Sequence, residues 1–360
     1  MKKVFLILTV ILSTLFMSQS VNASSGEDGE LNIKETIFHH LGDGYGWEVP
    51  FSHHHRIPLP IIVCGEDGWH CFMSSRIAHG ETFDGFKIAE EGDYAGKVVE
   101  VMPDGSVKRP LDLSITKNVL ALFISIALVL VCVLSVARWH RCNGYKAPRK
   151  GLGAIESLIS FVYDGVIKST LKHKARRFAP YLLTVFFFIF GMNLLGLMVI
   201  FPGGANLTGN IAVTLVLATI TFLVTNIFGT KHYWKDIFWP DVPLWLKFPL
   251  PIMPVIEIFG MFTKPAALTV RLFANMMGGH MIILVLTMLI FIFAPMGAGV
   301  AGATSVVSVL FSLFMLLIDV LVSFIQAYVF TMLSTIFISL AQEEGHHADE
   351  HNEHAQLTEK

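Results

Sequence analysis

The chain has 360 residues, of which 53% are hydrophobic and only 15% are charged, and its mean hydropathy is +0.61. These values lie well outside the norm of soluble globular proteins and indicate a polytopic membrane protein. The formal net charge is −2, and no basic stripe with interleaved aromatic residues points to nucleic acid as a partner.

The first residues have the three regions of a cleavable secretory signal. Two lysines follow Met1, an apolar run extends from Val4 to Met17, and small residues end at Ala23. We therefore predict a signal peptide over residues 1–23. The alternative is an uncleaved anchor, for which the apolar run is short, and in both cases the next segment is exported.

Residues 24–112 are polar and mixed in charge, with short alternating pieces that indicate a small, partly β exported region. Cys64 and Cys71 lie in it, and an oxidising compartment would allow a disulfide between them. Its histidines match no standard metal-ligand spacing, so we interpret them as solvated surface residues rather than a metal site.

Three spans are predicted in the next part of the chain, over residues 119–137, 180–201 and 211–228. A basic cluster follows the first span, as expected on the cytoplasmic side. Residues 153–174 are amphipathic and too charged to cross, so they are expected at the cytoplasmic surface. Residues 233–254 are rich in tryptophan and proline, which favours a broken segment in the interface.

Two long apolar segments, residues 264–293 and 304–341, complete five predicted crossings and are separated by a glycine-rich turn around residues 295–302. The predicted membrane domain covers residues 113–342. The acidic, histidine-rich tail, residues 343–360, is expected in the cytoplasm, where metal binding is the alternative to a disordered, solvated end. The predicted fold class is an all-α polytopic membrane protein with interfacial helices and a small exported N-terminal region.

Formal charges are sparse in the last two spans. Between Pro251 and Gln342 they are Glu257, Lys264, Arg271 and Asp319, and His280 is the only histidine inside an apolar span. An arginine at the centre of a membrane helix costs roughly 2.5 to 3.5 kcal/mol on insertion scales, and such a residue is by default a candidate functional site. Polar groups in lipid must face a partner or a water-filled cavity, so these side chains are expected to converge.

Aligning the two helices antiparallel, with Arg271 level with Gln326, predicts their relative depths. At ~1.5 Å per residue, His280 lies ~13.5 Å and Asp319 ~10.5 Å toward the exterior from that level. An imidazole and a carboxylate at similar depth form a plausible proton-relay pair.

The helical period places Arg271 and His280 on different sides of the fourth span. At ~100° per residue, Arg271 lies on a stripe of small and polar residues, with His280 nearly opposite. Small side chains permit the close approach of a partner helix, so the stripe suits a helix that slides past. The other members of the stripe are Ala267, Ala274, Asn275 and Gly278.

Polar residues repeat every seven positions on the fifth span, at Ser305, Ser312, Asp319 and Gln326, and the repeat ends at Leu333. One interpretation is a water-accessible path from the exterior to the middle of the membrane. The other is a set of hydrogen bonds between packed helices. The ionisable Asp319 favours the path.

Four motifs in these spans resemble subunit a of the F-type ATP synthase. They are Lys264-Pro265, Arg271-Leu-Phe-Ala-Asn275, Gly278-Gly-His280 and Gln326-Ala-Tyr-Val-Phe330. The resemblance covers roughly residues 32–345, apart from the exported insertion. It implies a stationary, non-catalytic proton-channel subunit that works with the c-ring, the peripheral-stalk subunit b and the rest of the synthase in the lipid of a bacterial inner membrane.

The resemblance also implies roles for individual residues. Arg271 would face the proton-carrying carboxylate of the rotating c-ring and prevent a short circuit between two half-channels, with Asn275 and Gln326 as polar neighbours. His280 and Asp319 match the positions that line the half-channel on the exported side. Many bacterial members have a glutamate and a histidine there, so the pair is exchanged in this chain.

Other positions complete the candidate site. Glu257 and Lys264 match family positions of less defined role, and Ser312 is a supporting polar position. No cofactor or metal is implied, and no Gly-x-x-x-x-Gly-Lys nucleotide loop is present.

Two other functions compete with this interpretation. A stand-alone secondary transporter or cation channel would usually show paired internal repeats with broken helices, which the sequence lacks. A purely structural anchor would not explain Arg271 and Asp319 within apolar spans.

Overall fold

The computed structural model describes residues 42–48, 56–89, 94–102, 106–144, 146–148, 151–198, 206–238 and 252–343. The predicted signal peptide and nearly all of the predicted tail lie outside the described residues. The chain forms two compact units. The first comprises Met1–Ile124, Leu195–Asn206 and Gly278–Val320, and the second Ser125–Leu194, Leu207–Met277 and Leu321–Lys360.

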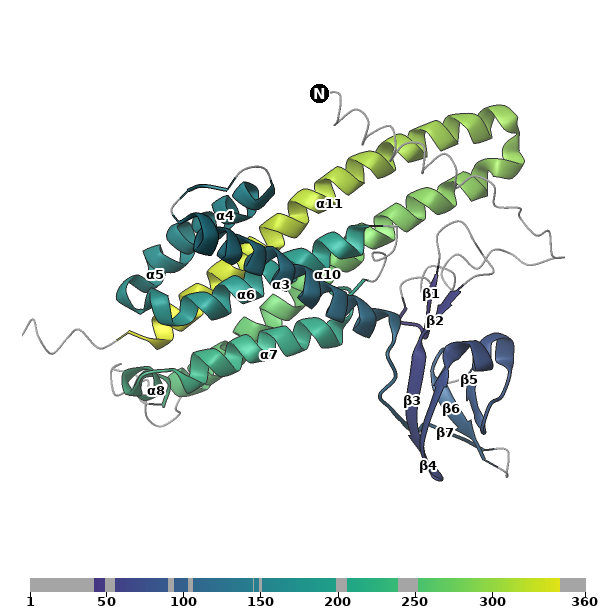
Figure 1. Ribbon diagram of the computed structural model, residues 1–360, viewed down its shortest axis with the longest axis horizontal. Coiled ribbons are helices and arrows are strands. Elements are labelled where there is room, and N and C mark those ends of the chain that lie inside the picture. The colour runs from purple at the N-terminus through teal and green to yellow at the C-terminus, as the bar shows by residue number, and fades with distance from the viewer. Residues whose placement is uncertain are drawn as a thin grey trace, which may run out of the picture. The chain divides into compact units, whose positions relative to one another are not determined.

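The first unit contains a small β domain in the region expected to be partly β (Figure 1). Its strands form an antiparallel pair, β1-β2, and two three-stranded antiparallel sheets with the orders β4-β3-β8 and β5-β6-β7. The strands are β1 (Gly46–Glu48), β2 (Arg56–Pro58), β3 (Pro60–Gly65), β4 (Gly68–Met73), β5 (Phe86–Ile88), β6 (Val98–Val101), β7 (Val107–Lys108) and β8 (Leu111–Asp112).

The core of the β domain follows from side chains that alternate along β3. Ile61 and Val63 are fully buried because every second side chain of a strand points to the same face. Phe72 and Phe86 pack with them in one cluster. Tyr45 connects the two larger sheets, since its hydroxyl donates to the Asp112 carboxylate of β8 and accepts from the Val98 amide of β6.

The cysteines of the domain are free in the structure. The strand register places Cys64 opposite Trp69 and Cys71 opposite Ile62. The two thiols are therefore on neighbouring strands but not directly opposite one another, and the disulfide that the sequence allowed is not formed.

Helices make up the rest of the described chain. They are α3 (Lys117–Asn143), α4 (Gly151–Val162), the π-helical turn Tyr163–Lys168, α5 (Ser169–Leu171), the 3-10 turn Lys172–Lys174, α6 (Ala175–Leu197), α7 (Ile211–Ile227), α8 (Lys231–Phe238), α10 (Ile252–Phe293) and α11 (Ala298–Ala341). Within the described residues, four helical stretches are long and apolar enough to cross a membrane, or five if α7 and α8 form one bent span. The predicted polytopic helical fold with about five spans is confirmed.

The largest departure from the predicted boundaries is α10, which begins at Ile252, whereas the fourth span was expected from Lys264. Helices usually end before a proline. The helix instead continues through Pro265, whose carbonyl accepts a hydrogen bond from the Thr269 hydroxyl. A proline removes one backbone hydrogen bond, and in membrane helices neighbouring groups can compensate for that loss.

The second unit buries one side of α10. Leu268 and Leu272 belong to a single core cluster that includes Leu182 and Phe186 of α6 and Phe330 of α11. The core thus holds α10 by its apolar side and determines which residues of the helix remain outside.

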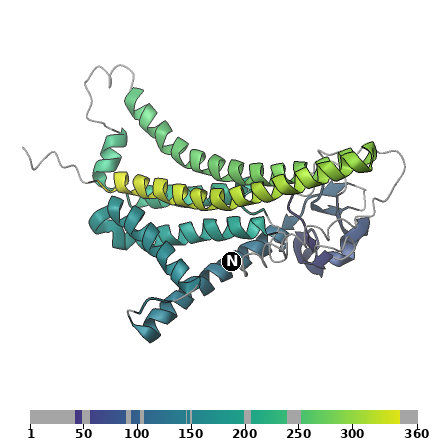
Figure 2. The same cartoon turned by 90° about the horizontal axis from the view of Figure 1, so that it is seen from above.

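In the first unit, residues 278–293 of α10 and 298–320 of α11 form an antiparallel helical hairpin, and Figures 1 and 2 both show the two helices side by side. A 3-10 turn, Ala294–Met296, and Gly297 at a φ of 113° connect them. The turn is shorter than the predicted one over residues 295–302, because α11 begins at Ala298. The Ser308 hydroxyl donates to the Leu286 carbonyl across the hairpin.

Candidate functional site

Arg271 lies on an exposed stripe of α10 in the second unit. The guanidinium forms no ion pair with any described residue. An adjoining side of the helix faces inward, since Leu268, Leu272 and Met276 are buried. The positive charge is therefore presented to the surroundings of the chain, among small side chains that leave room around it. The other exposed members of the stripe are Ala267, Ala274 and Asn275.

Asn275 and Gln326 bridge α10 and α11 in the same unit. The Asn275 side-chain amide donates to the Gln326 carbonyl oxygen at 2.7 Å. Gln326 is only 3% exposed, and its Nε2 has no partner among the described residues. The depth alignment placed Gln326 level with Arg271, but the structure places it against Asn275, one helical turn further along α10.

His280 and Asp319 come together in the first unit. The Asp319 carboxylate packs against Gly279, where a Cβ atom would lie 2.8 Å from the carboxylate oxygen. The His280 imidazole is close enough to interact electrostatically with that carboxylate, and its Nε2 lies 3.3 Å from the Gly196 carbonyl of α6. The structure thus brings the two predicted side chains into one neighbourhood, and Gly279 leaves the space that the Asp319 carboxylate occupies. Their role as a proton relay stays a prediction.

The serines of α11 make mostly local or packing contacts. Ser305 donates to the Ala301 carbonyl of its own helix, whereas the buried Ser308 bonds to α10. Ser312 is half-buried. The seven-residue repeat predicts Ser312 as a polar position but does not include Ser308.

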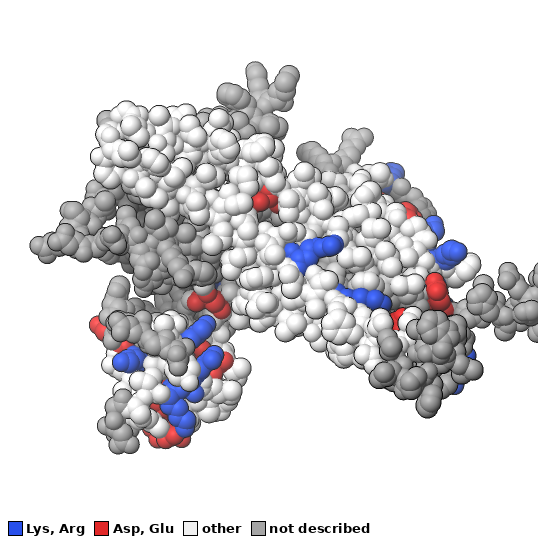
Figure 3. Space-filling model, turned by 180° about the vertical axis from the view of Figure 1, so that it is seen from behind, with Lys and Arg blue, Asp and Glu red and all other residues white. Residues whose placement is uncertain are grey.

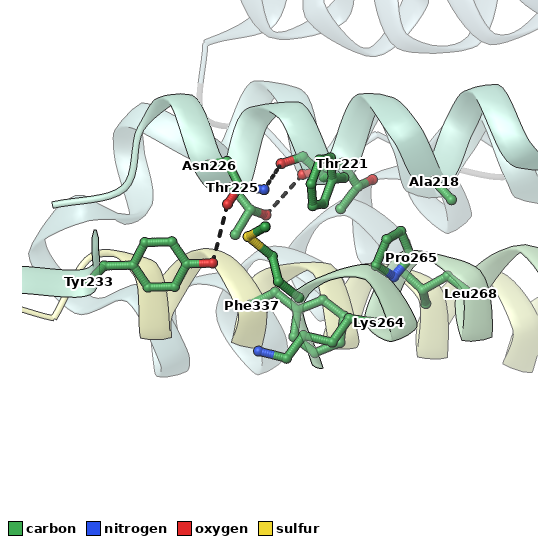
Figure 4. A pocket seen from close by; sticks show the side chains of 11 residues that line it. Ala218, Thr221, Thr225, Asn226, Tyr233, Lys264, Pro265, Leu268 and Phe337 are labelled. Atoms are coloured by element: carbon green, nitrogen blue, oxygen red, sulfur yellow. Dashed lines mark hydrogen bonds between the residues drawn. The ribbon is translucent and has the colours of Figure 1, made fainter. Parts of the chain in front are cut away.

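Lys264 lines a pocket between α7, α8, α10 and α11 (Figure 4). The pocket contains about 350 Å³ of empty space, part of it open to solvent. The Lys264 ammonium lies 5.5 Å from the centre of the Phe337 ring. The Tyr233 hydroxyl donates to the side-chain oxygen of Asn226, Oδ1, at 3.3 Å. Glu257 interacts electrostatically with Tyr233, so both supporting charged positions lie in the neighbourhood of this pocket.

Further buried polar residues were missed from the sequence. In the second unit the Thr208 hydroxyl donates to the Asn193 side chain at 2.8 Å, and Thr331 and Ser334 of α11 are fully buried with hydroxyls that have no partner among the described residues. Single hydroxyls in an apolar helix carry no period that distinguishes them from packing residues.

No cluster of three or more histidine, cysteine, aspartate or glutamate side chains suited to a metal ion occurs within the described ranges. The described side chains of α10 and α11 supply isolated charges and hydrogen-bonding groups. A histidine–carboxylate pair can hold or move a proton, whereas an exposed guanidinium can stabilise an anion.

Comparison with known proteins gives family matches for both parts of the chain. Residues 119–339 match the family described as ATP synthase A chain, and residues 36–114 match a domain of unknown function. ATP synthase subunit a 2 of Chlorobaculum tepidum is 42% identical over 268 residues, which cover 70% of this chain and 71% of the relative.

Two other relatives are similar to a comparable degree. ATP synthase subunit a of Myxococcus xanthus is 42% identical over 249 residues, covering 67% of this chain and 77% of the relative. ATP synthase subunit a 2 of Chlorobium luteolum is 42% identical over 329 residues, covering 84% and 90%. The last match extends well beyond the membrane helices.

Proposed function

This chain belongs to the ATP synthase A chain family, and on that premise we propose that Arg271 is the charge barrier of its proton path. Membership makes the chain a multi-pass, proton-channel component of the membrane sector, acting in ion transport and ATP synthesis with the rest of the complex. The proposal concerns how its own residues perform that task.

The observation that carries the proposal is the exposed stripe of α10. Arg271 stands on it as a permanent cation beside Ala267 and Ala274, and α10 carries no other formal charge from residue 265 to its end at Phe293. A charge in such a place needs a partner, and no described residue of the chain pairs with it. The partner we propose is the carboxylate of the rotating c-ring.

The proposed mechanism follows from the charge states of that carboxylate. In lipid it must be protonated, whereas beside Arg271 its anion is stabilised. A ring carboxyl therefore releases its proton on approaching Arg271 and takes up another on leaving it. A membrane potential supplies about 2.3 kcal/mol per proton per 100 mV, and the stationary cation prevents protons from passing without rotation.

The remaining site residues have supporting roles in this proposal. His280 and Asp319 relay protons between the exported side and the ring, and Asn275 with Gln326 provides polar surroundings one turn from Arg271. Glu257, Lys264 and Ser312 are proposed to support proton access. We assign the chain no catalytic step of its own, since nucleotide chemistry belongs to other subunits.

The topology that fits this mechanism has an exported N-terminus and a cytoplasmic C-terminus in the bacterial inner membrane. It combines the signal peptide, residues 1–23, and the exported region, residues 24–112, with five crossings in residues 113–342 and a tail in the cytoplasm. The direct partners are the c-ring and the peripheral-stalk subunit b.

Replacement of Arg271 tests the proposal in a reconstituted complex. Arg271→Ala should abolish ATP-driven proton pumping while the complex still assembles, because an exposed side chain contributes little to the fold. Val270→Ala is the matched control, since Val270 is 59% exposed on the same helix but carries no charge. Pumping by Arg271→Ala at the control level would overturn the assignment.

The stand-alone transporter or channel is distinguished by purification. A chain isolated repeatedly from its native membrane without a c-ring or catalytic head, yet transporting a solute by itself in liposomes, would contradict the proposal.

A further inference from the structure

One face of the sheet β4-β3-β8 is apolar and exposed. Ile61 and Val63 of β3 point into the domain core, so Ile62 and Cys64 point the other way. Residues directly opposite one another on paired strands share a face, and the register therefore adds residues of β4 and β8 to the same side. This outer sheet face consists of Ile62, Cys64, Trp69, Cys71, Met73, Leu111 and Leu113.

The outer sheet face is large and free of charge. Trp69 and Leu111 are each 61% exposed and Leu113 is 59% exposed, and no acidic or basic residue belongs to the face. The rest of the domain differs, because the β5-β6-β7 sheet carries Lys87, Glu100 and Lys108. Figure 3 shows charged side chains gathered on the side of the domain that it presents. The β domain is thus amphipathic.

Backbone hydrogen bonds hold this face beside the start of α3. The Leu113 amide donates to the Ile62 carbonyl at 2.9 Å, the Ile115 amide to the Pro60 carbonyl at 3.1 Å, and the Lys117 amide to the Gly44 carbonyl at 2.9 Å. Leu113 precedes the first residue of α3 by four positions, which span at most about 14 Å even when fully extended. Because α3 is a candidate membrane span, the face lies within reach of the bilayer surface.

We propose that the outer sheet face rests on the lipid bilayer, with Trp69 at the level of the headgroups. Exposed apolar patches of this kind mark interaction sites, and tryptophan is enriched where membrane and water meet. Lipid is the occupant that fits best, because the patch offers no charged group to a protein partner and its tether to α3 already places a bilayer beside it. The charged sheet then faces water.

A nitroxide probe on Cys71 tests this contact in the full-length chain in liposomes. The other three cysteines, Cys64, Cys132 and Cys142, are replaced by serine. The matched control moves the probe to Glu81→Cys, an exposed position outside the outer sheet face, with Cys71→Ser. Lipid contact predicts that the Cys71 probe collides more with oxygen than with a water-soluble nickel complex, and that the control probe shows the reverse.

Two results would overturn the proposal. A Cys71 probe as accessible to nickel as the control probe would place the face in water. A probe shielded from both reagents would indicate that protein covers the face.

A second measurement uses Trp69, one of the six tryptophans of the chain, and needs no probe. The total tryptophan emission lost to lipids brominated near the headgroup should be smaller in Trp69→Phe than in the unsubstituted chain, since Trp69 no longer contributes to the quenched emission. An equal loss of emission in both would contradict lipid contact of Trp69. Both experiments report depth rather than pumping, so their outcome is independent of the role proposed for Arg271.

Discussion

Gly279→Ala should impair proton pumping without unfolding the chain. A Cβ atom at this position would lie 2.8 Å from one Asp319 carboxylate oxygen and 2.9 Å from the other. An ordinary contact requires 3.4 Å, so the carboxylate must move by about 0.6 Å, and proton-transfer groups need positioning to within ≈ 0.5 Å. Because misplacement by about 1 Å can cost ~100-fold in rate, we expect a loss of pumping on the order of tenfold.

A glycine of α11 provides the control. A Cβ atom at Gly302 meets nothing within 4 Å, so Gly302→Ala changes helix propensity alone. Either substitution gains up to about 1 kcal/mol of helix stability. For Gly279→Ala, ATP-driven pumping by reconstituted complexes should therefore fall. The thermal midpoint of the purified chain should rise if the carboxylate moves at a small cost in free energy.

Pumping by Gly279→Ala at the level of Gly302→Ala would contradict the predicted displacement of the Asp319 carboxylate. A further check uses the Asp319→Ala background, where no carboxylate remains to be displaced. There Gly279→Ala should raise the thermal midpoint at least as much as it does with Asp319 in place. A smaller increase would show that the alanine methyl meets some other group.

The exchanged pair should be coupled, so His280→Glu together with Asp319→His should retain more pumping than either single change, whereas additive losses would argue against coupling. In the β domain, burial and the hydrogen bond to Asp112 raise the pKa of Tyr45, so its contribution to stability is complete below about pH 10 and is lost as the pH rises through the folded-state pKa. Absorbance titration at 295 nm should show that Tyr45→Phe leaves the tyrosines that ionise near pH 10 unchanged and removes only a component that ionises later. Loss of signal near pH 10 would mean that Tyr45 is accessible.

Apolar length and charge placement were sufficient to predict a helical membrane fold, but the local rules failed where packing compensates for them. Helices usually end before a proline, yet α10 runs through Pro265 and begins at Ile252 rather than at the predicted Lys264. The β strands were predicted only as alternating pieces, because strands of two to six residues carry too few alternations to define register. The outer sheet face could be identified only after the register of β3 with its neighbours was known.

The candidate site shows the same division. The period of a helix was enough to place Arg271 among small residues, since facing depends only on spacing along one helix. The pairing of Gln326 with Asn275 instead of Arg271 depends on the axial shift between two helices, which side-chain packing sets. The sequence showed Gly279 only as part of a motif. A glycine is needed there because Asp319 approaches it, and this approach is known only when both helices are placed.

The His280–Asp319 pair and Arg271 differ in where their interaction partners lie, and this difference supports different roles for them. His280 interacts electrostatically with Asp319 and its Nε2 lies near the Gly196 carbonyl, so the partners of this pair belong to the chain itself. Such an arrangement suits a fixed proton relay. Arg271 has an exposed position and no ion-pair partner among the described residues, so its charge is balanced only when another molecule supplies an anion. In the proposed mechanism the stationary subunit meets successive carboxylates of a moving ring, and this requires such an incomplete site, because an internal carboxylate would occupy Arg271 permanently.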